Sequence, residues 1–345
     1  MGSIWGIFLH AVGGFAAGSF YIPFRRVRAW SWESGWLVLG LSAWLLVPLV
    51  AATLTVEQPL AILRQSAPAT LGYTFLFGAL WGIGGLTFGL SMRYLGISLG
   101  MAIALGFCAA FGTLIPPLYQ GTFGTLFTQL PGQLTLAGVA VCLLGIAVCG
   151  RAGIGRERTR AATATDTAGD YHFSKGLLVA VVSGILSACF AFGIEAGAPI
   201  AARSLAAGAA PIFQNNPTMV VILLGGLLTN LVYCLVLNFK NRSYRDYTDV
   251  RTPLSGNYAW AALGGLTWYL QFFFYGMGTT FLGEALEFSS WTLHMAFIIL
   301  FSNAWGLYYG EWAGVTDGTR RTLFLGLALI LGSTLLVGAG SYLVK

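Results

Sequence analysis

Residues 268–295 read WYLQFFFYGMGTTFLGEALEFSSWTLHM. This stretch places a glutamine, two glutamates and a histidine among aromatic side chains, in one of the most apolar parts of the chain. It predicts two membrane-crossing helices joined by a very short connection. Ionisable side chains are costly at membrane depth and are found there mainly along transport and proton pathways. The stretch therefore indicates an integral membrane protein whose function is centred near Glu287.

The composition of the whole chain supports a lipid environment. Of its 345 residues, 57% are hydrophobic and 9% are charged, against about 25% charged residues in an average soluble domain. Mean hydropathy is +0.76. The net charge of +6 is spread between apolar blocks without a basic face, which argues against a nucleic-acid partner. We expect membrane lipid to surround the protein, and the sequence shows no sign of an obligate protein partner.

Apolar blocks long enough to cross about 30 Å of hydrocarbon recur along the chain. Ten such blocks lie near residues 3–23, 35–55, 69–91, 96–119, 133–151, 175–198, 217–239, 257–280, 285–309 and 322–343. The five cysteines fall inside these blocks with no metal-ligand spacing, so we expect neither a metal nor a cofactor. The first block lacks the basic segment that precedes the apolar core of a cleavable signal peptide.

Basic residues predict the orientation of the blocks. Connections after odd-numbered blocks hold 15 lysines and arginines, whereas connections after even-numbered blocks hold only Arg64 and Arg203. The positive-inside rule then makes the odd connections cytoplasmic and puts both termini in the periplasm. Residues 152–174 are polar and rich in small side chains, which predicts a cytoplasmic hinge loop between halves at 1–151 and 175–345.

An internal repeat supports this division. Trp81 matches Trp268, and Gly89 matches Gly276, at a constant offset of 187 residues. An odd number of predicted spans separates the two copies, so the second copy would be inverted in the membrane. Inverted repeats are typical of secondary transporters whose site lies between the repeats near mid-membrane.

The spacing of polar residues predicts two facing helix surfaces. Glu287, Trp291 and His294 would share one face of the ninth block, because their spacings are four and three residues. Trp268, Gln271 and Tyr275 would share a face of the eighth block, with Tyr269 beside them. Aromatic rings pack on the C–H faces of sugars, and amide, carboxylate and indole groups bind sugar hydroxyls. These groups favour proton-coupled uptake of a polyhydroxylated solute.

Each of these residues also has a structural interpretation. Glu287 could be a solvated residue at a helix N-terminus, as could Glu284, and the tryptophans could face lipid at the membrane interface. His294 and His10 could make structural hydrogen bonds as well as take part in transport. The run FRRVRAWSWE at 24–33 could anchor the chain at the interface, or Arg25 and Arg26 could pair with Glu33 in an inner gate.

Four segments carry a family resemblance. They are FYIPFRRVRAWSWE (20–33), WGIGGLTFGLSMRYLGISLGMAIALG (81–106), WYLQFFFYGMG (268–278) and SWTLHMAF (290–297). Together they resemble the bacterial L-rhamnose–proton symporter family, within the drug/metabolite transporter superfamily. The resemblance implies an all-α protein of the inner membrane, with ten transmembrane helices in two inverted five-helix repeats. It also implies inward transport of L-rhamnose with a proton, and L-lyxose and L-mannose as secondary substrates.

Three positions depart from the pattern of this family. Glu287 stands where an aspartate is familiar, which keeps the carboxylate but lengthens its reach. Glu195 stands where an asparagine is familiar, which puts its role in doubt. Arginines replace lysines in the segment 25–28, and this replacement keeps the positive charge.

These observations lead to one interpretation and two rivals. We expect Glu287 and His294 to handle the coupling proton, and Trp268, Tyr269, Gln271, Tyr275, Trp291, Trp81 and His10 to bind the sugar. Phe272, Phe273 or Phe88 would receive the methyl group of a 6-deoxy sugar. One rival is export or exchange of amino acids or other metabolites. The other, an enzyme acting on lipid-linked sugars, would need clustered charged residues for metal and phosphate chemistry, which the spans lack.

Overall fold

The computed structural model describes residues 2–119, 123–163, 172–282 and 287–342, and within these ranges every regular element is a helix. The first half contains α1 (Gly2–Ser19), α2 (Tyr21–Phe24), α3 (Trp32–Leu41), the π-helical turn η1 (Ser42–Leu46), α4 (Val47–Thr55), α5 (Pro59–Gln65), α6 (Pro68–Leu95), α7 (Ile97–Tyr119), α8 (Thr125–Thr128) and α9 (Leu130–Thr163). The second half contains α10 (Phe173–Ser187), α11 (Cys189–Ala196), α12 (Ala198–Ala206), η2 (Pro211–Phe213), α13 (Asn216–Asn241), η3 (Ser243–Tyr247), α14 (Leu254–Leu282), α15 (Glu287–Tyr308) and α16 (Asp317–Tyr342).

Many of these helices have the length and apolar character of membrane spans. Within the described ranges, seven helical segments are long and apolar enough to cross a bilayer, and shorter apolar stretches lie in α7 and α15. Such helices satisfy all of their backbone hydrogen bonds internally, as lipid requires. The prediction of an all-α, multi-pass membrane protein is therefore confirmed.

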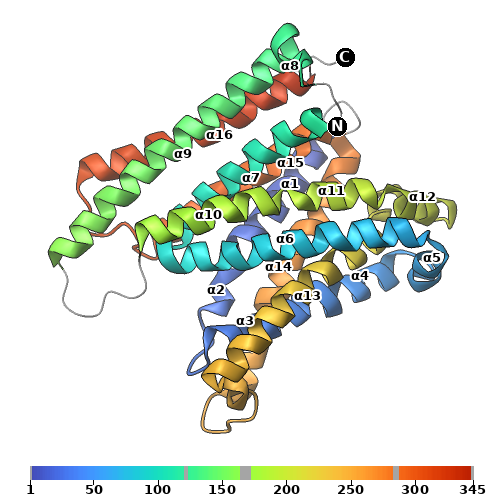
Figure 1. Ribbon diagram of the computed structural model, residues 1–345, viewed down its shortest axis with the longest axis horizontal. Coiled ribbons are helices and arrows are strands. Elements are labelled where there is room, and N and C mark those ends of the chain that lie inside the picture. Colours follow the sequence, from blue (N-terminus) through green and yellow to red (C-terminus); the bar gives the residue numbers. More distant parts are fainter. Residues whose placement is uncertain (1, 120–122, 164–171, 283–286, 343–345) are drawn as a thin grey trace.

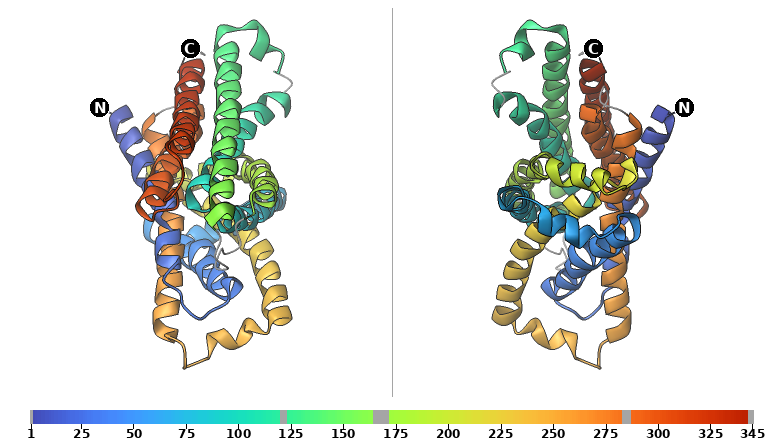
Figure 2. Two further views of the ribbon diagram at one scale, coloured as in Figure 1. Left: turned by 90° about the vertical axis from the view of Figure 1, so that its left-hand side faces the viewer. Right: turned by 90° about the vertical axis from the view of Figure 1, so that its right-hand side faces the viewer.

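The two halves of the chain pack against each other reciprocally. Helix α1 lies against α14 and α15, while α10 lies against α6 and α7. Helix α13 packs on α6 and α3, α14 packs on α3, and α9 runs along α16 (Figure 1). The views of Figure 2 show the α9–α16 pair beside the rest of the bundle. Each half thus supplies helices to both sides of a shared interior.

Glycines let two of these helix pairs approach closely. Gly14 and Gly18 of α1 face Phe297 and Phe301 of α15, which leave little space for an added Cβ. Gly78 of α6 lies against the backbone of Ile222 in α13. These contacts accord with the role of small residues between membrane helices.

The predicted hinge loop at 152–174 is partly wrong, because α9 continues to Thr163. Tertiary contacts explain the extension. The Arg156 side chain is buried, donates from Nη1 to the Leu95 carbonyl oxygen at 2.9 Å and lies over the Trp312 ring. These contacts stabilise helical backbone where composition alone suggested a linker. Residues 164–171 lie outside the described ranges.

Both ends of the described chain lie on the same side of the bundle. Figure 1 shows the N and C labels near α8, and the α2–α3 connection, the α13–α14 connection and the end of α9 at the opposite side. The most basic connections of the sequence, at 25–28 and 240–251, belong to that opposite side. The basic connections and the two chain ends thus lie on opposite sides of the bundle, as the distribution of lysines and arginines along the sequence predicts.

The close approach of α6 and α13 predicts a position-specific loss of stability. We expect Gly78→Ala to destabilise the fold by about 1–3 kcal/mol, because the new methyl group would overlap the Ile222 carbonyl oxygen. Gly72→Ala in the same helix is the control, since nothing lies within 4 Å of its added Cβ. Thermal unfolding in detergent measures both. Equal melting temperatures for the two variants would contradict the described α6–α13 contact.

Candidate functional site

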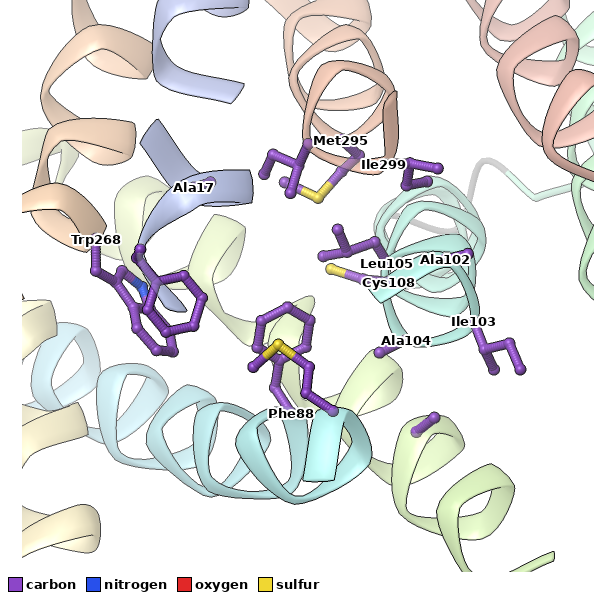
Figure 3. Packing of buried hydrophobic residues seen from close by; sticks show 14 of the residues in the cluster. Ala17, Phe88, Ala102, Ile103, Ala104, Leu105, Cys108, Trp268, Met295 and Ile299 are labelled. Atoms are coloured by element: carbon purple, nitrogen blue, oxygen red, sulfur yellow. The ribbon is translucent and has the colours of Figure 1, made fainter. Parts of the chain in front are cut away.

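A cavity lies among α1, α6, α7, α10, α14 and α15, and so draws on both halves of the chain. Its volume is about 50 Å³, enough for a few water molecules. Figure 3 shows Trp268, Phe88, Cys108 and Met295 arranged around this interior. The lining residues are Ala17, Phe20, Trp81, Gly85, Phe88, Leu105, Cys108, Ser187, Trp268, Gln271, Phe272, Tyr275, Trp291, His294, Met295 and Ile298.

One face of α14 forms a wall of the cavity. Trp268, Gln271, Phe272 and Tyr275 all line it, because side chains spaced by three and four residues share a helix face. Tyr269 does not line the cavity. It is buried behind this wall and contacts Phe273. Neighbouring residues of a helix project from different faces, so Tyr269 lies away from the cavity lining, and its predicted contact with the sugar stays a prediction.

One face of α15 forms the opposing wall. Trp291 and His294 line the cavity. The Trp291 ring is nearly parallel to that of Phe190 in α11, with 17° between the ring planes. Tyr275 of α14 meets both, with ring centroids 5.7 Å from Trp291 and 5.2 Å from His294. The two helix faces predicted from spacing therefore meet across one cavity.

A buried aromatic cluster holds Trp268 in place. Its ring centroid lies 4.2 Å from Phe20, 5.4 Å from Trp36 and 5.7 Å from Trp44. Trp44 lies in the π-helical turn η1, a local widening of a helix that is frequent at functional sites. Aromatic pairs at such distances contribute about 0.5–1.5 kcal/mol each beyond the area that they bury. The position of Trp268 is thus defined before any ligand enters.

Trp81 occupies the corresponding place in the first half of the chain. Its ring packs edge-on against Phe272, with centroids 5.5 Å apart, and also contacts Phe190. Trp81 and Trp268 both line the cavity, as do two further pairs at the repeat offset, Gly85 with Phe272 and Phe88 with Tyr275. Equivalent positions of the sequence repeat therefore face the same interior.

Several polar groups at the cavity have no hydrogen-bond partner within the described ranges. They include the indole N–H groups of Trp268 and Trp291 and both ring nitrogens of His294. The Gln271 side chain also lines the cavity. Leaving a buried polar group unpaired costs about 1–3 kcal/mol. A ligand that carries several hydroxyls would satisfy these groups.

His10 lies behind the α14 and α15 walls rather than in the cavity lining. It is fully buried, and its ring centroid lies 5.5 Å from Tyr275 and 5.7 Å from His294. Its Nε2 atom is 2.8 Å from the Ser290 hydroxyl. Sequence reasoning missed Ser290, although it is one turn before His294 on the same face of α15. Its spacing from Glu287 and His294 was the signal that could have identified it.

The acidic residues of this region are placed as follows. Glu284 lies outside the described residues. Glu287 begins α15, but its side chain lies outside the description, so the predicted proton role of Glu287 stays a prediction. Glu195 is exposed on α11 and does not line the cavity.

The expected pairing of Arg25 or Arg26 with Glu33 is not formed. Glu33 is buried, and its Oε1 atom accepts hydrogen bonds from Asn241 and Ser243, both at 2.8 Å. Arg25 lies over the Tyr309 ring, and Arg26 lies over the Trp260 ring, each 4.7 Å from the ring centroid. Cation–π contacts at the helix ends therefore take the place of the predicted ion pair.

Comparison with known proteins agrees with these features. The sequence profile of the L-rhamnose-proton symport protein family matches residues 2–342. The chain belongs to this family. Its members are transporters and not enzymes.

Individual relatives are similar along almost their whole length. The L-rhamnose-proton symporter of Cronobacter sakazakii is 40% identical over 343 residues, which cover 99% of this chain and 97% of the relative. Symporters with the same description in Klebsiella pneumoniae and Citrobacter koseri are 38% and 39% identical, with 97% of each chain covered. The resemblance expected from four sequence segments is confirmed across the chain.

Replacing Trp36 or Trp291 with phenylalanine should change the stability of the fold to different extents. Trp36→Phe should destabilise the fold more than Trp291→Phe, by about 1–3 kcal/mol, because the Trp36 N–H donates to the buried Asn230 side chain at 3.0 Å. The Trp291 N–H has no such partner in the part of the chain that the structure describes. Thermal unfolding of the two variants without sugar makes the comparison. A Trp291→Phe variant as unstable as Trp36→Phe would show that the indole N–H of Trp291 is already bonded.

Proposed function

We propose that this chain takes up L-rhamnose together with a proton across the bacterial inner membrane. The observation that carries this proposal is the cavity between α14 and α15, where aromatic rings and unpartnered N–H groups line one space. Rings suit the C–H faces of a sugar, and N–H and amide groups suit its hydroxyls. The membership of the symporter family names the sugar and the coupling ion.

Within this cavity we assign contacts by chemistry. Trp268 and Trp291 would pack on the sugar ring and donate to its hydroxyls, and Gln271 would bind a further hydroxyl. Phe88 and Phe272 would surround the methyl group of L-rhamnose, because both line the cavity while Phe273 does not. L-mannose and L-lyxose differ from L-rhamnose at this methyl position, and we propose them as secondary substrates that bind less tightly.

The size of the cavity supports transport by alternating access. A volume of about 50 Å³ holds only a few water molecules, so we expect the helices to separate when the sugar enters or leaves. Movements of one helix group against the other around a fixed central site are typical of secondary transporters built from repeats. In this protein, the cavity would widen towards one side of the membrane at a time.

We further propose ten membrane crossings in two inverted repeats of five. Two observations support this arrangement. Matched positions of the sequence repeat line one cavity, and α1 packs on α14 and α15 as α10 packs on α6 and α7. An approximate two-fold axis through the cavity would relate the two halves. The basic connections would then face the cytoplasm and both termini the periplasm, by the positive-inside rule.

Glu287 and His294 would couple the proton to the sugar. His294 lines the cavity directly, and Glu287 begins the same helix. A proton and a sugar that bind neighbouring groups change each other's affinity equally, which is the thermodynamic basis of symport. Glu287 in its neutral form would favour sugar binding.

The proposal predicts how two variants separate binding from coupling. In proteoliposomes, addition of L-rhamnose to the unaltered protein should cause proton uptake. Gln271→Ala should weaken sugar binding by about 10-fold or more, because a hydrogen bond to the sugar is lost. Glu287→Gln should abolish rhamnose-driven proton uptake. Measurements of proton uptake and of labelled rhamnose accumulation test both effects.

A matched control is Gln133→Ala, since Gln133 is exposed on α9, far along the chain from the cavity residues. It should leave both measurements unchanged. Full pH-dependent accumulation by Glu287→Gln would remove Glu287 from the proton pathway. If L-rhamnose caused no proton uptake by the unaltered protein, the proposed function itself would be wrong.

A further inference from the structure

A chain of hydrogen bonds connects α1, α14 and α15 beside the cavity. His10 Nε2 is 2.8 Å from Ser290 Oγ, and Ser290 Oγ is 2.8 Å from Thr279 Oγ1. Thr279 Oγ1 in turn donates to the backbone carbonyl oxygen of Tyr275 at 2.9 Å. The hydroxyl groups of Ser290 and Thr279 do not line the cavity. They would therefore influence the cavity only through His10.

The direction of this chain follows from counting protons. A hydroxyl has one hydrogen to donate, and Thr279 gives its hydrogen to a carbonyl oxygen that can only accept. Ser290 must therefore donate to Thr279, and His10 Nε2–H must donate to Ser290, for the three bonds to coexist. The neutral imidazole of His10 then carries its hydrogen on Nε2. Its Nδ1 atom is a bare acceptor with no partner within the described ranges.

His294 brings a second unpaired imidazole next to the first. The two ring centroids are 5.7 Å apart, and neither nitrogen of His294 has a hydrogen-bond partner among the described residues. Both side chains are buried, with exposed fractions of 0% and 2%. At this distance, with 64° between the ring planes, the two rings are in direct edge contact. The two neutral rings thus offer two bare nitrogens, Nδ1 of His10 and one nitrogen of His294, that could accept a proton.

Few titratable groups face this pair from the neighbouring helices. Helix α14 presents Tyr275 to both rings, and α7 presents Cys108 across the cavity that His294 lines. The charged residues of α16, Asp317, Arg320 and Arg321, belong to its first turns. In α15 the charged residue is Glu287 at its start, and α1 contains none. A proton on the histidine pair would place a positive charge beside the cavity, at the helix that Glu287 begins.

We propose that His10 and His294 hold the coupling proton together, and that Ser290 and Thr279 are positioning residues that keep the Nδ1 atom of His10 ready to accept it. Repulsion between two imidazolium rings this close disfavours a second proton, so the pair takes one. His294 connects this proton to the sugar because it also lines the cavity. The inference rests on the proposed function and adds His10, Ser290 and Thr279 to its proton site.

The test uses the full-length protein in proteoliposomes and two readouts. One is proton uptake driven by L-rhamnose, and the other is counterflow of labelled L-rhamnose, which exchanges sugar without net proton movement. His10→Gln retains a donor to Ser290 but binds no proton. We expect this variant to lose at least 10-fold in rhamnose-driven proton uptake while counterflow stays within about 2-fold of the unaltered protein.

The positioning residues have matched controls on the same helices. Ser290→Ala and Thr279→Val should move the pH of half-maximal uptake to lower values, because the hydroxyl chain favours the charged ring through a stronger hydrogen bond. Thr280→Val and Ser302→Ala are the controls, since their hydroxyls donate only to carbonyl oxygens of their own helices. The controls should keep the pH profile of the unaltered protein.

The outcomes separate this inference from the proposed function. Full proton-driven accumulation by His10→Gln would overturn the inference, and so would an equal loss of counterflow, which would make His10 a sugar contact. If His10→Gln failed to fold, unchanged pH profiles for Ser290→Ala and Thr279→Val would overturn it instead. Absence of both readouts in the unaltered protein would refute rhamnose–proton symport and not the histidine pair alone.

Discussion

Asn230 of α13 joins the helices on which the cavity depends. Its Nδ2 atom donates to the carbonyl oxygens of Gly82 and Gly226, and its Oδ1 atom accepts from the Trp36 N–H. Because these groups are buried, each bond would be costly to leave unmade. Trp36 then packs against Trp268, which forms a wall of the cavity. The Asn230 amide therefore links the contact between α6 and α13, through Trp36, to Trp268 at the proposed sugar site.

The cavity combines apolar walls with polar groups that have no hydrogen-bond partner within the described ranges. Some buried hydroxyl groups of the bundle bond to distant segments, as Ser42 does to the Ala262 carbonyl oxygen, whereas others, such as that of Thr74, lack a partner within the described ranges. At the cavity the N–H groups of Trp268 and Trp291 and the ring of His294 have no hydrogen-bond partner among the described residues. Unpaired polar groups in a buried space cost stability, and proteins retain them where a ligand will complete them. Packing within the aromatic cluster around Trp268 offsets this loss of stability and holds the side chains of the site in place.

Much of this arrangement could be predicted from the sequence. Hydrophobic block length located the long helices, because crossing lipid requires about 20 apolar residues. Spacing by three and four residues correctly put Trp268, Gln271 and Tyr275 on one face and Trp291 and His294 on another. The offset of 187 residues identified Trp81 as the partner of Trp268 at the same cavity. These predictions succeeded because they depend on helical periodicity and on little else.

Features that depend on contacts between distant segments were beyond that reasoning. The extension of α9 rests on Arg156 reaching Leu95, 61 residues away. The bonds of Glu33 come from Asn241 and Ser243, more than 200 residues along the chain. The link between His10 and Ser290 spans 280 residues. Tyr269 shows a different limit, because a residue next to Trp268 in the sequence lies on another face of α14, away from the cavity lining.

The proposed function requires that L-rhamnose occupies the cavity between α14 and α15. An experimental structure of the protein in a lipid bilayer with bound L-rhamnose would show where the sugar lies. We expect density for the sugar between Trp268 and Trp291, with Gln271 within hydrogen-bond distance and the methyl group towards Phe88 or Phe272. Sugar density outside the lining of this cavity would contradict it.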